Sequence, residues 1–203
     1  DEARKILETL VGYKELRMMY ACALKEVRTK FEVLDVEFNV RYSRNPINAI
    51  HTRLKSNQSI LEKMQRRRIP FSLENLETRI QDVAGVRVIC SYVDDIYRLS
   101  EALLRQDDVK LIAQKAYIQQ PNPNGYRSLH LIVRVPVFFA DQRRDLPVEV
   151  QIRTIAMDFW ASLEHQLKYK QNVPDQEAIV EQLRHCAQRV SDLDEEMLAI
   201  RRR

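Results

Sequence analysis

Residues 126–135 read Tyr-Arg-Ser-Leu-His-Leu-Ile-Val-Arg-Val, and residues 147–153 read Pro-Val-Glu-Val-Gln-Ile-Arg. Apolar and polar side chains alternate in both stretches, which is the pattern of a β-strand with one buried face. The apolar set is Leu129, Leu131, Val133 and Val135 in the first stretch, and Val148, Val150 and Ile152 in the second. We therefore expect two neighbouring strands of one sheet that share a core on one side.

The other side of these two strands is predicted to carry polar side chains. The first strand contributes Tyr126, Ser128, His130, Ile132 and Arg134, and the second contributes Glu149, Gln151 and Arg153. A face that only meets solvent usually carries Lys, Glu and Thr. The composition found here therefore favours a binding or catalytic site, with a solvated sheet face as the alternative.

The rest of the chain predicts an α+β fold, with helices around a mixed sheet of about four or five strands. We expect helices at residues 1–38, 56–68, 72–80, 94–106, 154–170 and 174–203, and strands at 47–55, 86–90, 109–118, 126–138 and 146–153. Residues 1–203 are expected to form a single domain, with helical segments at 1–44 and 171–203 around a core at 45–170. The terminal helices exceed what one small sheet can cover, so we also expect them to build an oligomer interface.

The composition is that of an ordinary globular protein with a small positive excess. Apolar residues make up 45% and charged residues 31%, the net charge is +4, and the pI is about 9.0. The excess fits a polyphosphate ligand or RNA, although a solvated basic surface would produce it too. No apolar run approaches the roughly 20 residues of a membrane span, and Cys22, Cys90 and Cys186 are typical of reduced thiols. We expect a cytoplasmic protein with no membrane partner.

Glycine is too rare here for a phosphate-binding loop made of backbone. Only Gly12, Gly85 and Gly125 occur, so neither a Walker loop nor a dinucleotide-binding loop can be written. Side chains would have to hold the phosphates of any bound nucleotide. The cationic group of Arg53 and Lys55 is followed by Ser59 and Lys63 at helical spacing, for which a solvated helix face is the alternative.

Two carboxylates are candidates for a metal site. Asp82 falls just before a predicted strand and Glu149 falls within one. Side by side they could hold Mg²⁺, a hard cation that prefers oxygen ligands and often bridges substrate phosphates. The alternatives are a cap or turn role for Asp82, and a salt bridge to Arg153 or Arg87 for Glu149.

Five motifs follow one another along the chain at sensible spacing. They are Arg53-x-Lys55-Ser56-x-x-Ser59-Ile60-x-x-Lys63, Asp82-Val83-Ala84-Gly85-Val86-Arg87, Gly125-Tyr126-Arg127-Ser128-x-His130, Glu149-Val150-Gln151-Ile152-Arg153-Thr154 and Phe159-Trp160-Ala161-Ser162-Leu163-Glu164-His165. Together they resemble the synthetase domain of RelA/SpoT-type alarmone synthetases, from about Asn45 to Lys170. The length is similar to that of the small, synthetase-only members.

The resemblance implies a nucleotidyltransferase-like core and a pyrophosphokinase reaction of the stringent response. The β,γ-pyrophosphate of ATP would move to the 3′-hydroxyl of GDP or GTP, which would give AMP and ppGpp or pppGpp. Asp82 and Glu149 would bind Mg²⁺, and Glu149 could also take the proton of the attacking hydroxyl.

The resemblance also implies roles for the residues that bind the two nucleotides. Arg53 and Arg87 would sandwich adenine, and Lys55, Ser59 and Lys63 would hold the ATP phosphates. Tyr126 would stack on guanine. The other residues placed near the acceptor nucleotide are Lys115, His130, Gln151 and Asp158.

Two other functions are kept as alternatives. A single-stranded RNA-binding module is indicated by the pI, by Arg66-Arg67-Arg68 and by the terminal arginines. Another nucleotidyltransferase of the same fold would release pyrophosphate instead of AMP. Several small relatives are tetramers with an activating alarmone site between subunits, so we expect a homotetramer. Regulation by an alarmone or by single-stranded RNA stays open.

Overall fold

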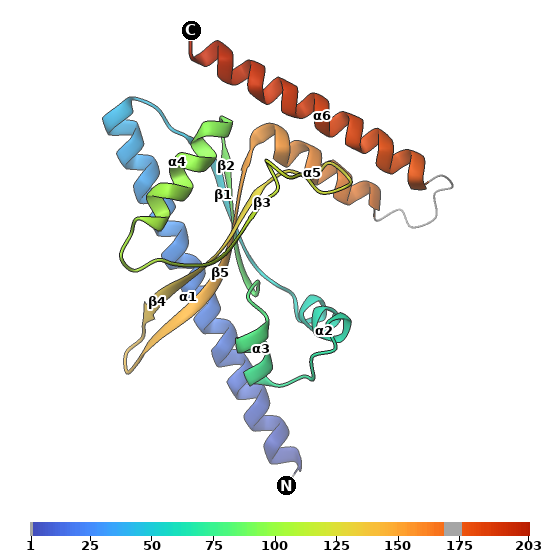
Figure 1. Ribbon diagram of the computed structural model, residues 1–203. Coiled ribbons are helices and arrows are strands. Elements are labelled where there is room, and N and C mark those ends of the chain that lie inside the picture. Colours follow the sequence, from blue (N-terminus) through green and yellow to red (C-terminus); the bar gives the residue numbers. More distant parts are fainter. Residues whose placement is uncertain (1, 169–175) are drawn as a thin grey trace.

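The computed structural model describes residues 2–168 and 176–203, which surround one five-stranded sheet (Figure 1). The strands are β1 (Ile47–Leu54), β2 (Ala84–Cys90), β3 (Lys110–Ala116), β4 (Leu129–Phe138) and β5 (Arg143–Thr154). Their order across the sheet is β1-β2-β5-β4-β3. Strands β2 and β5 are parallel and the other neighbours are antiparallel, which confirms the predicted α+β fold with a mixed sheet.

The described helices are α1 (Glu2–Tyr42), α2 (Asn57–Arg66), α3 (Leu73–Arg79), α4 (Val93–Leu104), α5 (Ile155–Lys168) and α6 (Gln176–Arg201). Ser56 is the predicted N-cap of α2, since its Oγ accepts a hydrogen bond from the backbone N of Ser59 at 3.2 Å. The predicted helix end at residue 170 and helix start at residue 174 lie outside the described residues. None of the described helices is both long and apolar enough to cross a membrane.

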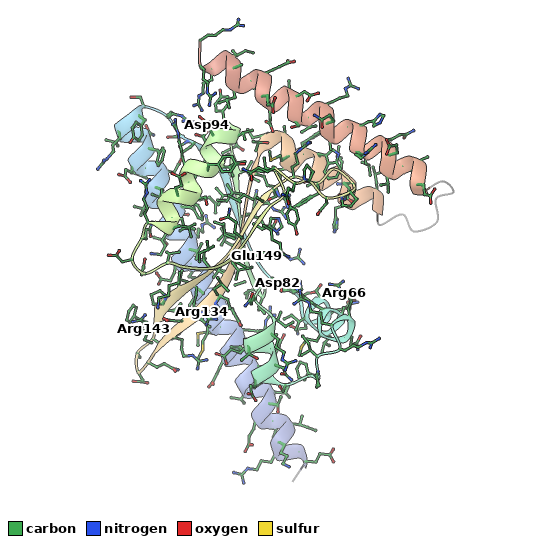
Figure 2. The ribbon with its side chains drawn as sticks, in the orientation of Figure 1. Arg66, Asp82, Asp94, Arg134, Arg143 and Glu149 are labelled. Carbon is green, nitrogen blue, oxygen red and sulfur yellow. The ribbon has the colours of Figure 1, made fainter. Side chains whose placement is uncertain are left out.

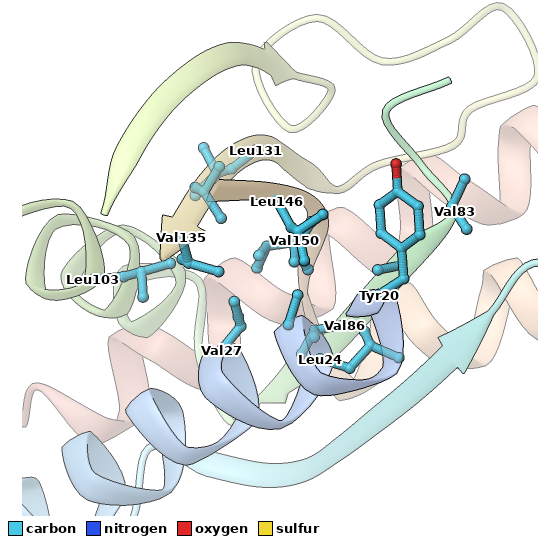
Figure 3. Packing of buried hydrophobic residues seen from close by; sticks show 14 of the residues in the cluster. Tyr20, Leu24, Val27, Val83, Val86, Leu103, Leu131, Val135, Leu146 and Val150 are labelled. Atoms are coloured by element: carbon cyan, nitrogen blue, oxygen red, sulfur yellow. The ribbon is translucent and has the colours of Figure 1, made fainter. Parts of the chain in front are cut away.

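Helices α1 and α4 cover one face of the sheet, where the apolar half of each strand forms the core. Leu24 and Val27 of α1 lie near Val86 and Val150 from two neighbouring strands, and Tyr20 of the same helix lies near Val83 (Figure 3). Burying a side chain such as fully enclosed Val27 contributes about 1.5–3 kcal/mol. The long N-terminal helix is therefore part of the core, and it continues past the predicted end at residue 38.

Of the described helices, none packs along the length of the opposite face of the sheet, which carries the polar half of the alternating pattern. Figure 1 shows α2 and α3 near one end of the sheet and α5 and α6 near the other. This arrangement leaves the middle of β1, β2, β5 and β4 available as the floor of a site.

The prediction that a strand starts at residue 126 was wrong, because β4 begins at Leu129. The side chain of Asn124 accepts a hydrogen bond from the Tyr126 backbone N at 3.2 Å, so this N–H is satisfied in a turn instead of a strand ladder. The placement of Ser128 on the open polar face was also wrong. Ser128 is buried, and its hydroxyl donates to the carbonyl of Ile152 at 3.3 Å.

Candidate active site

A cavity of about 600 Å³ opens on the polar face of β1, β2 and β5. The strand register places its side chains in two rows across the sheet. Arg53, Gly85 and Glu149 form one row. His51, Arg87 and Gln151 form the next, because residues two apart on a strand share a face. Lys55 and Asp82, just outside the strands, complete the polar lining.

A second cavity of about 140 Å³ adjoins the first. Asp82 and Glu149 line both cavities, so they lie at the junction. Four cations line the second cavity, namely Lys63, Arg67, Arg79 and Lys115. Figure 2 shows Asp82 and Glu149 near one another in the middle of the molecule. Two carboxylates thus stand between two cation-lined spaces.

The carboxylate of Asp82 is held by two lysines through one oxygen. Lys55 Nζ lies 3.0 Å and Lys63 Nζ 2.5 Å from Asp82 Oδ2. Burial raises the pKa of Asp82, but the hydrogen bonds from Lys63 and Lys55 outweigh burial and bring the pKa below its ordinary value. The second oxygen, Oδ1, is buried and has no hydrogen-bond partner among the described residues. Asp82 is therefore ionised, with one oxygen available to a ligand.

Glu149 is held more loosely than Asp82. Its Oε2 accepts a hydrogen bond from Gln151 Nε2 at 3.1 Å, and its Oε1 lies 3.7 Å from His130 Nδ1. Burial, and after it the negative charge of Asp82, raises the pKa of Glu149 above its ordinary value. A carboxylate with a raised pKa is a better proton acceptor, so Glu149 is suited to general-base chemistry.

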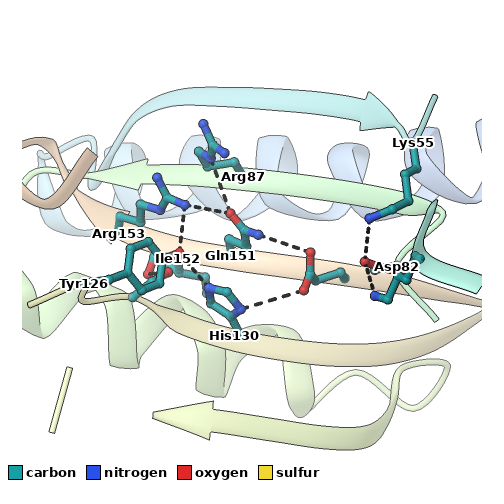
Figure 4. Close-up of polar contacts among 11 residues, drawn as sticks. Lys55, Asp82, Arg87, Tyr126, His130, Gln151, Ile152 and Arg153 are labelled. Carbon is teal, nitrogen blue, oxygen red and sulfur yellow. Dashed lines mark hydrogen bonds and ion pairs between the residues drawn. The ribbon is translucent and has the colours of Figure 1, made fainter. Parts of the chain in front are cut away.

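A hydrogen-bonded network connects Glu149 to Tyr126 along the polar face (Figure 4). Tyr126 Oη and His130 Nε2 are 2.8 Å apart. Arg153 donates through Nη2 to Tyr126 Oη at 2.8 Å and to Gln151 Oε1 at 2.8 Å. Burial, and then the positive charges of Arg153, Lys115 and Arg87, lowers the pKa of His130 to about 4. His130 is therefore neutral at neutral pH.

The structure brings most of the predicted site residues to these two cavities. Arg53, Lys55, Arg87 and Gln151 line the larger cavity, and Lys63, Lys115 and His130 line the smaller one. Tyr126 and Asp158 line neither cavity but contact residues that do: Tyr126 Oη lies 2.8 Å from His130 Nε2, and Asp158 Oδ1 lies 3.7 Å from Arg87 Nη1. Ser59 lies in the first turn of α2, where its Oγ accepts a hydrogen bond from the Ser56 hydroxyl at 2.9 Å.

Several residues of the site were not predicted from the sequence as site residues. Strand alternation did place Arg153 on the polar face, but no separate role was assigned to it. His51 precedes Arg53 by two positions, so the same alternation could have identified it. Arg67 follows Lys63 by one helical turn, which is a comparable signal. Arg79, at the end of α3, had no such signal in the sequence.

Comparisons with known proteins relate this site to one family. A region found in RelA/SpoT proteins matches residues 52–174, which is more than half of the chain. The chain is similar to the GTP pyrophosphokinase YwaC of Bacillus subtilis (strain 168). The two are 39% identical over 202 residues, which cover 100% of this chain and 95% of that protein.

Solved structures of the same kind match nearly the whole chain. The small alarmone synthetase 2 from Bacillus subtilis superposes with a TM-score of 0.83 at 41% identity, covering 94% of this chain and 98% of that one. The small alarmone synthetase 1 from Bacillus subtilis, bound to its product pppGpp, gives a TM-score of 0.84 at 37% identity, with coverage of 93% and 96%. The likeness therefore extends to the terminal helices as well as the sheet.

Proposed function

This chain belongs to the RelA/SpoT family, and we propose on this basis that it is a GTP pyrophosphokinase that makes (p)ppGpp. ATP donates its β,γ-pyrophosphate to the 3′-hydroxyl of GDP or GTP, and AMP is released. The observation that carries the proposal is the junction of the two cation-lined cavities, where Asp82 and Glu149 lie together. A transfer between two nucleotides needs two such spaces with one shared reacting centre.

The charge of the cavities suits two polyphosphates. ATP and GDP together bring about seven negative charges into one cleft, which must be neutralised by fixed cations. Three cations line the larger cavity, and four line the smaller one. Phosphoryl-type transfer needs positioning and charge neutralisation more than covalent help, which these walls supply.

ATP is proposed to bind in the larger cavity. Arg53 and Arg87 project from adjacent strands, where planar guanidinium groups can stack on the two faces of adenine. Lys55 and Lys63 would hold the phosphates, since both ammonium groups already converge on one oxygen of Asp82. Ser59 is proposed to reach the phosphates from the first turn of α2.

The acidic residues fit a magnesium ion. Asp82 Oδ1 is a buried oxygen donor with no hydrogen-bond partner among the described residues, and Glu149 lines the same two cavities. The described residues contain no cluster of three or more acidic, His or Cys side chains that could hold a metal. Asp82 and Glu149 would therefore hold Mg²⁺ together with phosphate oxygens and water. When bound, the ion neutralises phosphate charge.

Glu149 is proposed to act as the general base. It takes the proton of the 3′-hydroxyl, and the resulting oxygen forms a bond to the β-phosphorus of ATP. The bond between that phosphorus and the oxygen that bridges to the α-phosphorus breaks, and this oxygen leaves with AMP. The raised pKa of Glu149 brings its basicity nearer to the working pH.

The guanine nucleotide is proposed to bind beside the smaller cavity. Tyr126 would stack on guanine, and Lys115 and His130 line the wall that leads to Glu149. Arg153 donates hydrogen bonds to both Gln151 and Asp158, so these two side chains lie at the same end of the site. Because stacking accepts any base, the polar groups around Tyr126 would supply the selection for guanine.

The direct test is a product assay with purified protein. Incubation with ATP, GDP and Mg²⁺, followed by nucleotide chromatography, should yield AMP and a guanosine tetraphosphate in equal amounts. Release of pyrophosphate without AMP would assign the chain to another kind of nucleotidyltransferase. The absence of both AMP and a tetraphosphate would refute the proposal.

We also propose that the protein is a cytoplasmic homotetramer. All three cysteines, Cys22, Cys90 and Cys186, are free thiols, which suits a reducing compartment. Self-association is supported by apolar side chains of α1 that are exposed by 51–63% in the single chain, namely Ile6, Leu7, Leu10 and Val11. Light scattering coupled to gel filtration should give a tetramer mass that falls in the Leu7→Glu variant. A monomer mass for the unaltered protein would contradict this assignment.

A further inference from the structure

Arg153 lies at the centre of the polar network without lining either cavity. We propose that Arg153 is a positioning residue of the acceptor site, which holds Tyr126 and sets the direction of the hydrogen bonds from Tyr126 through His130 toward Glu149. The inference rests on the proposed function, which places Tyr126 and His130 beside the guanine nucleotide. The strand pattern had placed Arg153 on the polar face without assigning it a role of its own.

The contacts of Arg153 span three parts of the chain. The residue is only 4% exposed, although arginine is rarely buried unless it is paired. Its two terminal nitrogens donate to Tyr126 in the loop before β4, to Gln151 in β5 and to Asp158 in α5, at 2.8, 2.8 and 3.1 Å. A planar guanidinium with fixed donor directions can hold three such groups in one arrangement, which a lysine cannot do.

Arg153 also fixes the plane of the Tyr126 ring. Its Cζ lies 5.2 Å from the ring centroid, which is within the range of a cation–π interaction. The edge of Tyr117 packs against the same ring at a centroid distance of 5.9 Å and an interplanar angle of 67°. With one ring face covered by the guanidinium, a purine base would stack on the other face.

The same contacts determine which way the hydrogen bonds run. A guanidinium can only donate, so the oxygen of Tyr126 accepts from Arg153. His130 Nε2 lies 2.8 Å from the same oxygen, and we infer that the tyrosine donates its hydrogen to this nitrogen. A neutral imidazole that accepts at Nε2 carries its proton on Nδ1. That Nδ1–H faces Glu149 Oε1 at 3.7 Å.

The charges around His130 agree with this arrangement. Cations approach the ring from three strands, Arg87 on β2, Lys115 on β3 and Arg153 on β5, and the carboxylate of Glu149 faces it from β5. These cations oppose a further positive charge on the ring, and the Glu149 carboxylate faces its Nδ1.

Steady-state kinetics provide the first test. Arg153→Met is expected to raise the KM for GDP or GTP by about tenfold or more, because a charged donor to three acceptor-site groups is lost. The KM for ATP is expected to stay within about twofold, since Arg153 lines no part of the ATP cavity. Arg153→Lys should rescue only part of the loss. Arg134→Met is the matched control, because Arg134 also projects from the β4–β5 pair, donates a hydrogen bond to the carbonyl of Asp145 and lines neither cavity.

Nitrogen-15 NMR of the histidines provides a second test that needs no activity. In the unaltered protein His130 should show the tautomer with its proton on Nδ1. Arg153→Met should mix the two tautomers, because the oxygen of Tyr126 would no longer accept from Arg153. Tyr126→Phe keeps the ring but removes the hydroxyl, so it should also mix the two tautomers of His130. It is the variant to measure if Arg153→Met does not fold.

The outcomes separate this inference from the proposed function. An unaltered tautomer in Arg153→Met or Tyr126→Phe would overturn the inference, as would an equal rise in the KM for both nucleotides. An unaltered protein that makes no AMP would overturn the pyrophosphokinase assignment instead. The NMR result would still decide whether Arg153 orients His130.

Discussion

Replacing Glu149 with Gln separates the chemistry of this site from its stability. The amide keeps the size of the side chain and the oxygen that accepts from Gln151, 3.1 Å away, but it removes the charge and the proton acceptor. A general base contributes about 10²–10⁴ to the rate, which corresponds to about 3–5 kcal/mol of activation free energy. We therefore expect kcat to fall by about that factor.

Stability should change in the opposite direction. Burial and the charge of Asp82 raise the pKa of Glu149, so the folded protein binds this proton more tightly than the unfolded chain does. Ionised Glu149 destabilises the folded protein. This destabilisation is absent at pH values below the pKa of Glu149 in the unfolded chain, and it is complete above the pKa of Glu149 in the folded protein. The neutral Glu149→Gln variant should thus be at least as stable as the unaltered protein at neutral pH, and this advantage should vanish in acid.

Two assays on the same preparations check this prediction. AMP formation measured by chromatography gives the rate, and urea unfolding at neutral and acid pH gives the free energy of unfolding. Glu62→Gln is the matched control, because Glu62 also accepts from a glutamine amide, that of Gln58 at 2.9 Å, but lines neither cavity. Activity within about fivefold of normal in Glu149→Gln would refute the base assignment. A large loss of stability would show that Glu149 is structural.

Three further changes test other parts of the site and the core. Asp82→Asn should lower turnover by about 10²–10³-fold. It should also move the acid limb of the pH profile of kcat/KM to lower pH, because loss of the neighbouring charge lowers the pKa of Glu149, and an unchanged acid limb would contradict this. Tyr126→Ala should raise the KM for the guanine nucleotide by about 5–150-fold, which corresponds to about 1–3 kcal/mol of stacking. The KM for ATP should stay nearly constant, and an equal rise in both KM values would exclude stacking on guanine. Tyr20→Phe should leave the free energy of unfolding, measured in urea, unchanged or raise it by about 1 kcal/mol, since the buried Tyr20 hydroxyl has no partner among the described residues.

The alternating strands were the most predictable part of this molecule. One pattern in β4 and β5 indicated both the buried side, with Leu131 and Val150, and the polar side, with His130 and Glu149. The start of β4 could not be predicted, because it depends on whether the side chain of Asn124 satisfies a backbone N–H in a turn. A local hydrogen bond of this kind leaves no periodic signal in the sequence.

The parts of the site that depend on long-range contacts were harder to predict. Arg79 lines the smaller cavity only because α3 ends beside the sheet. Arg153 was visible on the polar face, but its link to Asp158 depends on how α5 follows β5. Alternation shows on which face a side chain lies, and it does not show which partner from another element will meet it there.

The sheet also explains how this chain can hold polyphosphates without a glycine-rich loop. Backbone amides must approach a phosphate closely, which requires glycine, whereas side chains on rigid strands reach it from fixed positions two residues apart. Cations gathered for this purpose repel one another in the free protein. Asp82 offsets that repulsion, because one of its oxygens binds both Lys55 and Lys63. A phosphate that approaches these lysines meets ammonium groups that are already oriented, and the loss of ordering entropy on binding is correspondingly small.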